Sequence, residues 1–155
     1  MAIEIEIKLA FEKGFSEPQI KALESVLKRL ACDYSISKKN LENAYFDTTA
    51  FLLNKNKVAL RIRKKINDRG EAVFIQTFKT AGQSVNGLSQ RGEWEWGLSI
   101  NKLNLTKLKQ CEAWPEIIET ADLVKVFETN FTRYQADITW HNSSIELVLD
   151  WGFII

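Results

Sequence analysis

Like-charged side chains occur in this sequence as pairs whose members are separated by one residue. The pairs are Glu4 and Glu6, Arg61 and Arg63, and Glu93 and Glu95. In a β-strand, residues i and i+2 lie on the same face, about 6–7 Å apart. Paired carboxylates at this spacing suit a hard cation such as Mg²⁺ or Mn²⁺, and paired guanidinium groups suit phosphate oxygens. The three pairs therefore point to a site for a polyphosphate that carries a divalent metal.

Further charged residues lie on the same strand faces as these pairs or on neighbouring strands. They are Lys8, Lys79, Arg91, Arg133, Glu146 and Asp150. Both signs recur from strand to strand, as a metal-polyphosphate complex would require. An antiparallel sheet that keeps one face in water is also charged on that face. The pattern thus leaves two interpretations open, a solvated face or an enclosed charged site.

Alternation of polar and apolar residues predicts that strands make up most of the fold. The expected strands cover residues 3–9, 41–47, 58–65, 72–79, 90–98, 124–135 and 145–151. A helix is expected after an N-cap at Ser16, with an apolar stripe made by Ile20, Leu23, Leu27 and Leu30. A weaker helical region at 101–121 is broken by Pro115, and turns are expected at 54–57 and 67–70.

These elements predict a single α+β domain over residues 1–155. Closing the antiparallel sheet into a β-barrel would place the charged face inside. The apolar face would then lie outside, under the helices. Trp94, Trp96 and Trp114 are expected to pack in the apolar core, and His141 is expected in a hairpin turn without a chemical role.

The composition excludes several classes of protein. Of 155 residues, 45% are hydrophobic and 26% charged, which is typical of a globular domain rather than a disordered one. The net charge of +1 is not that of a general polyanion binder, so we expect no nucleic-acid partner. The sequence contains no long apolar run, and Cys32 and Cys111 are isolated thiols. We expect no signal peptide at the N-terminus, which is acidic from the fourth residue. We therefore expect a soluble, cytoplasmic protein with free cysteines and no membrane partner.

Seven ordered motifs make the sequence similar to a known family. They are Glu4-Ile5-Glu6-Ile7-Lys8, Tyr45-Phe46-Asp47-Thr48, Leu60-Arg61-Ile62-Arg63, Thr77-Phe78-Lys79, Arg91-Gly92-Glu93-Trp94-Glu95, Phe131-Thr132-Arg133 and the segment 145–152, which ends in Asp150-Trp151-Gly152. In type and order they resemble the CYTH family, the triphosphate tunnel metalloenzymes. This family includes inorganic triphosphatases, thiamine triphosphatases and class IV adenylyl cyclases. The stretch from Thr77 to Arg91 most resembles the bacterial inorganic triphosphatases.

The resemblance implies a role for each matching residue. Metal ligands would be Glu4, Glu6, Asp150 and Glu146, binding Mg²⁺ or Mn²⁺. Oxygens of a triphosphate-containing small molecule would be held by Lys8, Arg61, Arg63, Lys79, Arg91 and Arg133. Glu93 and Glu95 would be catalytic, ordering these groups or the attacking water. The implied reaction is hydrolysis of inorganic triphosphate or another triphosphate inside the barrel.

Members of this family continue beyond the last strand found here to another strand with alternating Glu residues. From the resemblance we therefore expect the domain to be truncated, with the barrel open at its C-terminal edge. An open strand edge favours pairing with another chain, so a homodimer is expected there. The alternative of another class is a polyphosphate- or nucleotide-binding module without catalytic activity.

Overall fold

A computed structural model describes residues 2–7, 17–30, 33–66, 69–85 and 88–155. Its strands form one antiparallel sheet in the order β1-β6-β4-β3-β2-β7-β8, with β5 paired to β6. The strands are β1 (Ala2–Ile7), β2 (Asp33–Asp47), β3 (Ala59–Ile66), β4 (Ala72–Lys79), β5 (Gln83–Val85), β6 (Leu88–Leu98), β7 (Val124–Trp140) and β8 (Ser143–Ile154). The helices are α1 (Glu17–Arg29), α2 (Leu52–Lys55), α3 (Leu105–Lys109) and the 3₁₀ turn η1 (Thr120–Asp122).

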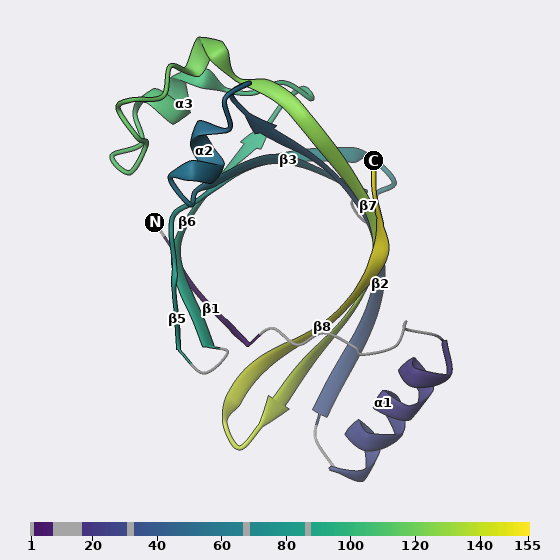
Figure 1. Ribbon diagram of the computed structural model, residues 1–155. Coiled ribbons are helices and arrows are strands. Elements are labelled where there is room, and N and C mark those ends of the chain that lie inside the picture. Colours follow the sequence, from purple (N-terminus) through teal and green to yellow (C-terminus); the bar gives the residue numbers. More distant parts are fainter. Residues whose placement is uncertain (1, 8–16, 31–32, 67–68, 86–87) are drawn as a thin grey trace.

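The sheet curls into an antiparallel half-barrel, with β1 and β8 at the two ends of the strand order (Figure 1). Within the described residues no ladder joins β1 to β8. The fold class predicted from the sequence is confirmed, including the open form of the barrel. None of the helices in the described ranges is long and apolar enough to cross a bilayer.

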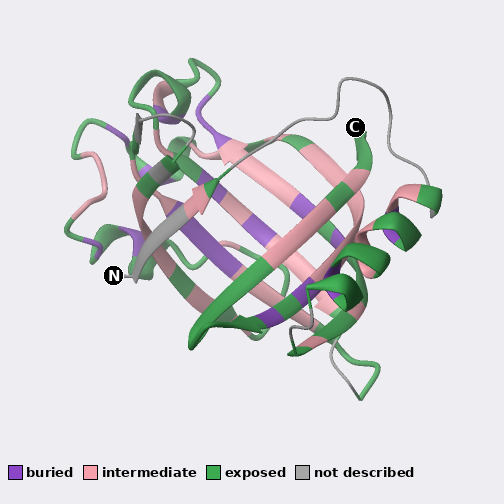
Figure 2. Cartoon of the chain, turned by 90° about the horizontal axis from the view of Figure 1, so that it is seen from below, coloured by how far each residue is buried: buried purple, intermediate pink, exposed green. Residues whose placement is uncertain are grey.

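Helix α1 lies outside the curved sheet and covers one part of its convex face (Figures 1 and 2). Leu27 is buried there with Ala136 and Ile138 of β7, and Leu147 of β8 packs against the same cluster. The helix and its apolar stripe were predicted, but Leu30 follows the last helical residue and is exposed. Because side chains alternate along a strand, the intervening residues of β7 and β8 face the concave side.

Helices α2 and α3 cover the other part of the convex face. Leu53 of α2 and Leu108 of α3 are buried in one cluster with Leu60 and Phe78 of β3 and β4. Trp94, Trp96 and Trp114 pack against this cluster, which confirms their predicted place in the core. The charged residues at alternate positions of β3, β4 and β6 therefore face the concave side.

Helix α2 covers residues 54 and 55 of the turn that the sequence predicts at 54–57, and residues 56 and 57 form a turn as predicted. The carboxylate of Asp47 accepts hydrogen bonds from the backbone N–H groups of Thr48, Leu53 and Asn54, at 2.7, 2.8 and 3.0 Å. Two of these donors lie in the first turn of α2, where backbone N–H groups lack intrahelical partners. The carboxylate of Asp47 thus stabilises a short helix that precedes the turn.

The β7–β8 hairpin is longer than the alternation predicts. Its two-residue turn consists of His141 and Asn142, which both have positive φ, at 45° and 62°. Such turns match the twist of the flanking strands, so pairing extends to Trp140 and Ser143. The prediction that His141 lies in a hairpin turn is confirmed. Strand β2 also begins earlier than predicted, because Asp33 pairs with Thr139 of the extended β7.

The remaining predictions concern a short strand, the helical region, the second turn and the cysteines. The short strand β5 was not predicted, and only α3 and η1 are helical within 101–121. Residues 67–68 of the second predicted turn lie outside the described residues. Cys111 is free and buried, as expected, whereas Cys32 lies outside the described part of the chain.

Candidate functional site

Three arginines predicted to bind phosphate lie near one another on the concave face. Arg61 and Arg63 alternate along β3, and Arg133 lies on β7, with β2 between the two strands. The guanidinium carbons of Arg63 and Arg133 lie 5.9 and 5.8 Å from the ring centre of Phe131. The aromatic ring therefore contacts two cationic groups from different strands.

The arginines of this group repel one another. Burial, followed by the charges of Arg61 and Arg133, lowers the pKa of Arg63 from its ordinary value to about 10, although Tyr45 and Asp150 oppose the shift. The Nε atom of Arg61 is buried and has no hydrogen-bond partner among the described residues. A group of desolvated cations with an unused donor is an environment that an anion would stabilise.

Arg133 is balanced by a carboxylate directly opposite it on β8. Its Nε and Nη2 atoms donate to the two carboxylate oxygens of Asp150 at 2.8 and 2.7 Å. Burial lowers the pKa of Arg133, but the hydrogen bond to Asp150 and the charges of Asp150, Glu146 and Glu6 raise it above its ordinary value. Glu6 belongs to β1, at the other end of the strand order, so its influence shows that the curled sheet brings its two ends electrostatically close.

A second group of predicted residues is formed by β4, β6 and β1. Lys79 and Glu93 lie opposite each other and form an ion pair of 3.1 Å, with both side chains largely buried. Glu95 accepts a hydrogen bond of 3.1 Å from the hydroxyl of Thr77. Arg91 contacts Glu6 at 3.3 Å. The structure thus places these predicted residues together on the concave face.

The predicted metal ligands do not form a preassembled cage. Among the described residues, no three His, Cys, Asp or Glu side chains are placed to hold one metal ion. Both oxygens of Asp150 accept from Arg133, and Glu146 accepts from Gln135 at 3.0 Å. The backbone of Glu4 pairs with Arg91, whereas Lys8 lies outside the described residues. The described carboxylates thus contact donors of this chain, and the side chain of Glu4 lies outside what the structure describes.

The structure also places residues on the concave face to which the sequence pattern assigned no role. Asn43 bonds to Arg63, Phe131 contacts two arginines, and Gln135 donates to both Asp137 and Glu146. These residues occupy alternate positions of β2 and β7, in phase with Tyr45 and Arg133. That phase is the signal that would have found them. Their types, uncharged or aromatic, did not suggest phosphate chemistry.

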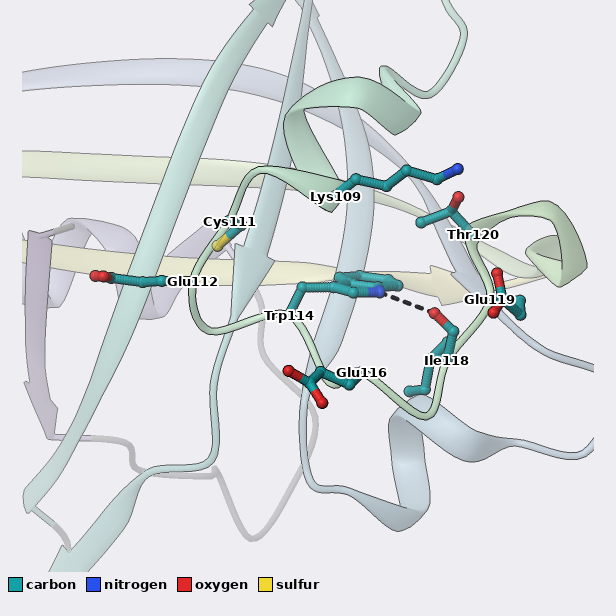
Figure 3. Close-up of a pocket in the computed structure, with 8 residues that line it drawn as sticks. All are labelled: Lys109, Cys111, Glu112, Trp114, Glu116, Ile118, Glu119 and Thr120. Atoms are coloured by element: carbon teal, nitrogen blue, oxygen red, sulfur yellow. Dashed lines mark hydrogen bonds between the residues drawn. The ribbon is translucent and has the colours of Figure 1, made fainter.

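A cavity of about 410 Å³ lies outside the concave face, in the segment that contains α3 and η1 (Figure 3). Its lining includes Lys109, Cys111 and Glu112. The indole of Trp114 donates a hydrogen bond of 2.9 Å to the backbone oxygen of Ile118 across it. None of the predicted site residues lines this cavity, so the candidate site remains the concave face.

Comparison with known proteins finds a family whose sequences are similar to almost all of this chain. The model of the CYTH domain matches residues 2–155. An inorganic triphosphatase from Haemophilus influenzae is 32% identical over 158 residues, which cover 100% of this chain and 41% of that protein. The chain thus spans about two-fifths of the length of this curated relative.

Two solved structures share the fold at low sequence identity. One is an adenylyl cyclase candidate from Hippeastrum, described as having a dominant triphosphatase activity. It matches with a TM-score of 0.59 and 18% identity over 99% of this chain and 73% of that one. The other, from Pyrococcus horikoshii, matches with a TM-score of 0.52 and 18% identity over 86% and 70% of the two chains. Since the family model matches almost the whole sequence and the curved sheet carries the predicted motifs, the chain belongs to the CYTH family.

Proposed function

We propose that this chain binds inorganic triphosphate on the concave face of its half-barrel and hydrolyses it. The observation that carries the proposal is the group formed by Arg61, Arg63 and Arg133, in which mutual repulsion and burial lower the pKa of Arg63 to about 10. Even so, Arg63 is protonated at neutral pH. A polyanion that binds here would replace repulsion between cations with attraction, a gain specific to a highly charged ligand.

The number of cations on the concave face suits a triphosphate better than a single phosphate. Besides the three arginines, Lys79 and Arg91 lie on the same face, and each is already near a carboxylate. A charge-assisted hydrogen bond contributes roughly 1.5–3 kcal/mol. Several such bonds, distributed over β3, β4, β6 and β7, would hold a chain of phosphoryl groups along the face.

In the proposed reaction, water attacks a terminal phosphorus in line with the bridging oxygen that leaves. The arginines stabilise the charge that is distributed over the phosphoryl oxygens. Glu95 is the proposed acceptor for the water's proton or hydrogen bond, because among the described residues it is held by Thr77 rather than by a cation. Glu93 is proposed to orient Lys79 toward the substrate through their ion pair.

Triphosphate tunnel metalloenzymes generally depend on divalent metals, and we propose that Mg²⁺ or Mn²⁺ arrives here as part of the substrate complex. Phosphate oxygens would supply most of its ligands, as is usual for Mg²⁺ bound to nucleotides. Glu4 and Glu6, at alternate positions of β1, would add carboxylates. This arrangement requires no cage of three acidic side chains, and the described residues contain none.

A second candidate function is a binding module that retains polyphosphate without turnover. It is favoured by one observation, that Asp150, Glu93 and Glu6 are each paired with a cation rather than directed to a common point. The relatives favour hydrolysis, since the Haemophilus protein is named an inorganic triphosphatase and the Hippeastrum protein is described by its triphosphatase activity. Thiamine triphosphate hydrolysis and adenylyl cyclisation remain alternatives within the family.

One set of assays separates these functions. Phosphate release is measured with tripolyphosphate, thiamine triphosphate and ATP, each with Mg²⁺, with Mn²⁺ and with chelator, and cyclic AMP is measured with ATP. Preferential metal-dependent release from tripolyphosphate is the expected result. Tripolyphosphate binding without release from any substrate would establish the binding module instead. Absence of binding in calorimetry would overturn both candidates.

A further inference from the structure

On the concave face, side chains from three neighbouring strands form a continuous hydrogen-bonded row that includes Arg63. Arg63 of β3 lies opposite Asn43 of β2, which in turn lies opposite Thr129 of β7. The Nε of Arg63 donates to Oδ1 of Asn43 at 2.8 Å, and Nδ2 of Asn43 donates to the hydroxyl of Thr129 at 2.9 Å. The three residues are far apart in sequence, since the sequence separation is 20 for the first two and 86 for the second two.

The chemistry of the row determines how Asn43 is oriented. A guanidinium group only donates hydrogen bonds, so the amide oxygen must face Arg63 and the amide nitrogen must face Thr129. Asn43 is 2% exposed, which makes its hydrogen bonds costly to lose. The buried amide of Asn43, which is held on its other side by Thr129, therefore restrains the Nε atom of Arg63.

The restraint leaves the outer part of the guanidinium for a ligand. Arg63 bonds to Asn43 through Nε, and in the described part of the chain neither of its two terminal nitrogens belongs to this row. These two nitrogens form the pair that binds two phosphate oxygens at once. Because Asn43 is uncharged, it orients Arg63 without neutralising it, in contrast to Asp150, which forms an ion pair with Arg133.

The ring of Phe131 also contacts the guanidinium group of Arg63. It lies two positions after Thr129 on β7 and contacts both Arg63 and Arg133. Gly152 of β8 lies opposite Phe131, and a Cβ at Gly152 would collide with the backbone and Cβ of Phe131. The missing side chain thus allows the strands to approach each other where Phe131 contacts the two cations.

We propose that Asn43, supported by Thr129, is a positioning residue that presents Arg63 to the triphosphate. The inference rests on the proposed function, because it assumes that Arg63 contacts the ligand. Asn43 itself is not proposed to contact phosphate. Its effect on affinity must therefore pass entirely through Arg63.

A double-mutant cycle tests this dependence. Tripolyphosphate affinity is measured by calorimetry for the wild type, Asn43→Ala, Arg63→Ala and the double variant. We expect Arg63→Ala to weaken binding about ten- to hundredfold, since it removes a charge-assisted contact. Asn43→Ala should weaken it about three- to tenfold, the size of one net hydrogen bond, and should have no further effect once Arg63 is absent.

Two more variants keep the test valid if Asn43→Ala unfolds. Thr129→Val leaves Asn43 in place but removes its second partner, and a smaller, equally Arg63-dependent loss is expected. Asn43→Asp retains the acceptor but neutralises Arg63, so affinity should fall although the fold is kept. Asn40→Ala is the matched control, because Asn40 lies on the same strand, is exposed and belongs to the opposite face. Thermal unfolding is followed for every variant.

The outcomes distinguish this inference from the function on which it rests. If Arg63→Ala weakens binding but neither Asn43→Ala nor Thr129→Val does, the positioning role is wrong and the proposed site remains. An Asn43→Ala loss that is equally large in the Arg63→Ala background would also overturn the positioning role. If Arg63→Ala leaves affinity unchanged, the assignment of Arg63 to the ligand fails, and the inference fails with it.

Discussion

Arg133 and Asp150 lie opposite each other on β7 and β8 and are joined by two hydrogen bonds of 2.8 and 2.7 Å. This geometry is that of a bidentate guanidinium–carboxylate pair. Asp150 thereby uses Nε and one of the two terminal nitrogens of Arg133, donors that a phosphate group could otherwise take. The ion pair consequently competes with the ligand, and the competition can be measured.

The first prediction concerns Asp150→Asn. Without metal, the variant should bind tripolyphosphate about three- to tenfold more tightly, because Arg133 no longer has a competing carboxylate. Calorimetry in chelator measures this change. If Asp150 also contacts the metal of the substrate complex, the gain should shrink or reverse when Mg²⁺ is present. Weaker binding of the variant in chelator would show that Asp150 orients Arg133 rather than competing for it.

The second prediction concerns the dependence of binding on pH. Because the pKa of Arg63 in the folded chain is about 10, its contribution to anion binding should be complete at pH 7.5 and should decline as the pH rises through 10. The ratio of wild-type to Arg63→Ala affinity should therefore fall toward one over this range. A ratio that stays constant from pH 8 to 10.5 would contradict the lowered pKa.

The lowered pKa of Arg63 also determines how this group changes the stability of the fold with pH. The unfolded chain retains the higher, ordinary pKa, so in the window between about 10 and that value it binds more protons at Arg63 than the folded chain does. Stability contributed by this group therefore rises with pH in that window, and its charge opposes folding at neutral pH. Tripolyphosphate should accordingly raise the melting temperature at pH 7.5 more for the wild type than for Arg63→Ala.

The third prediction tests the metal hypothesis through Glu6→Gln. The change removes one carboxylate of the predicted pair and its contact with Arg91 at 3.3 Å, while side-chain size is kept. We expect weaker Mg²⁺-dependent tripolyphosphate binding, with little or no loss in chelator. Glu128→Gln, which alters an exposed ion pair with Lys125, is the control. Equal metal dependence in wild type and Glu6→Gln would remove Glu6 from the ligand set.

The fourth prediction concerns the short helix α2. Asp47 is buried and accepts three backbone hydrogen bonds, so Asp47→Ala should lower the free energy of unfolding by about 2–4 kcal/mol. Urea denaturation measures the loss. Asp122→Ala, at an exposed position of η1, should change stability little. Similar stability of both variants would show that α2 forms without the carboxylate.

The fifth prediction addresses the edge formed by β8. This strand ends the described strand order, and Phe153, Ile154 and Ile155 are exposed by 61, 75 and 68%. Exposed apolar edges favour pairing, and we expect concentration-dependent dimers of this chain in light scattering. Phe153→Lys should shift the population toward monomer, whereas Phe51→Lys, at another exposed aromatic residue, should not. A wild-type monomer at all concentrations would exclude this interface.

Much of the fold follows from local patterns that the sequence displays directly. Alternation predicted the strand at 72–79 with the bounds that the structure has, and it placed Trp94 and Trp96 opposite the charged residues of the same strand. The spacing of Arg61 and Arg63 likewise determined that they share a face. These properties depend on the period of a strand alone, so no knowledge of neighbouring strands was required.

Strand order and register depend on the tertiary structure, because alternation assigns a residue to a face but does not identify its neighbour. The sequence therefore left the pairing of Arg133 with Asp150 and the row from Arg63 through Asn43 to Thr129 undetermined. Helix α2 was missed for a different, local reason: the carboxylate that binds its N–H groups belongs to Asp47, six and seven residues before them, and not to the N-cap residue Phe51. The amino-acid sequence by itself determined which side chains share the concave face. Only the curling and register of the sheet decided which of them touch, because those contacts join segments distant along the chain.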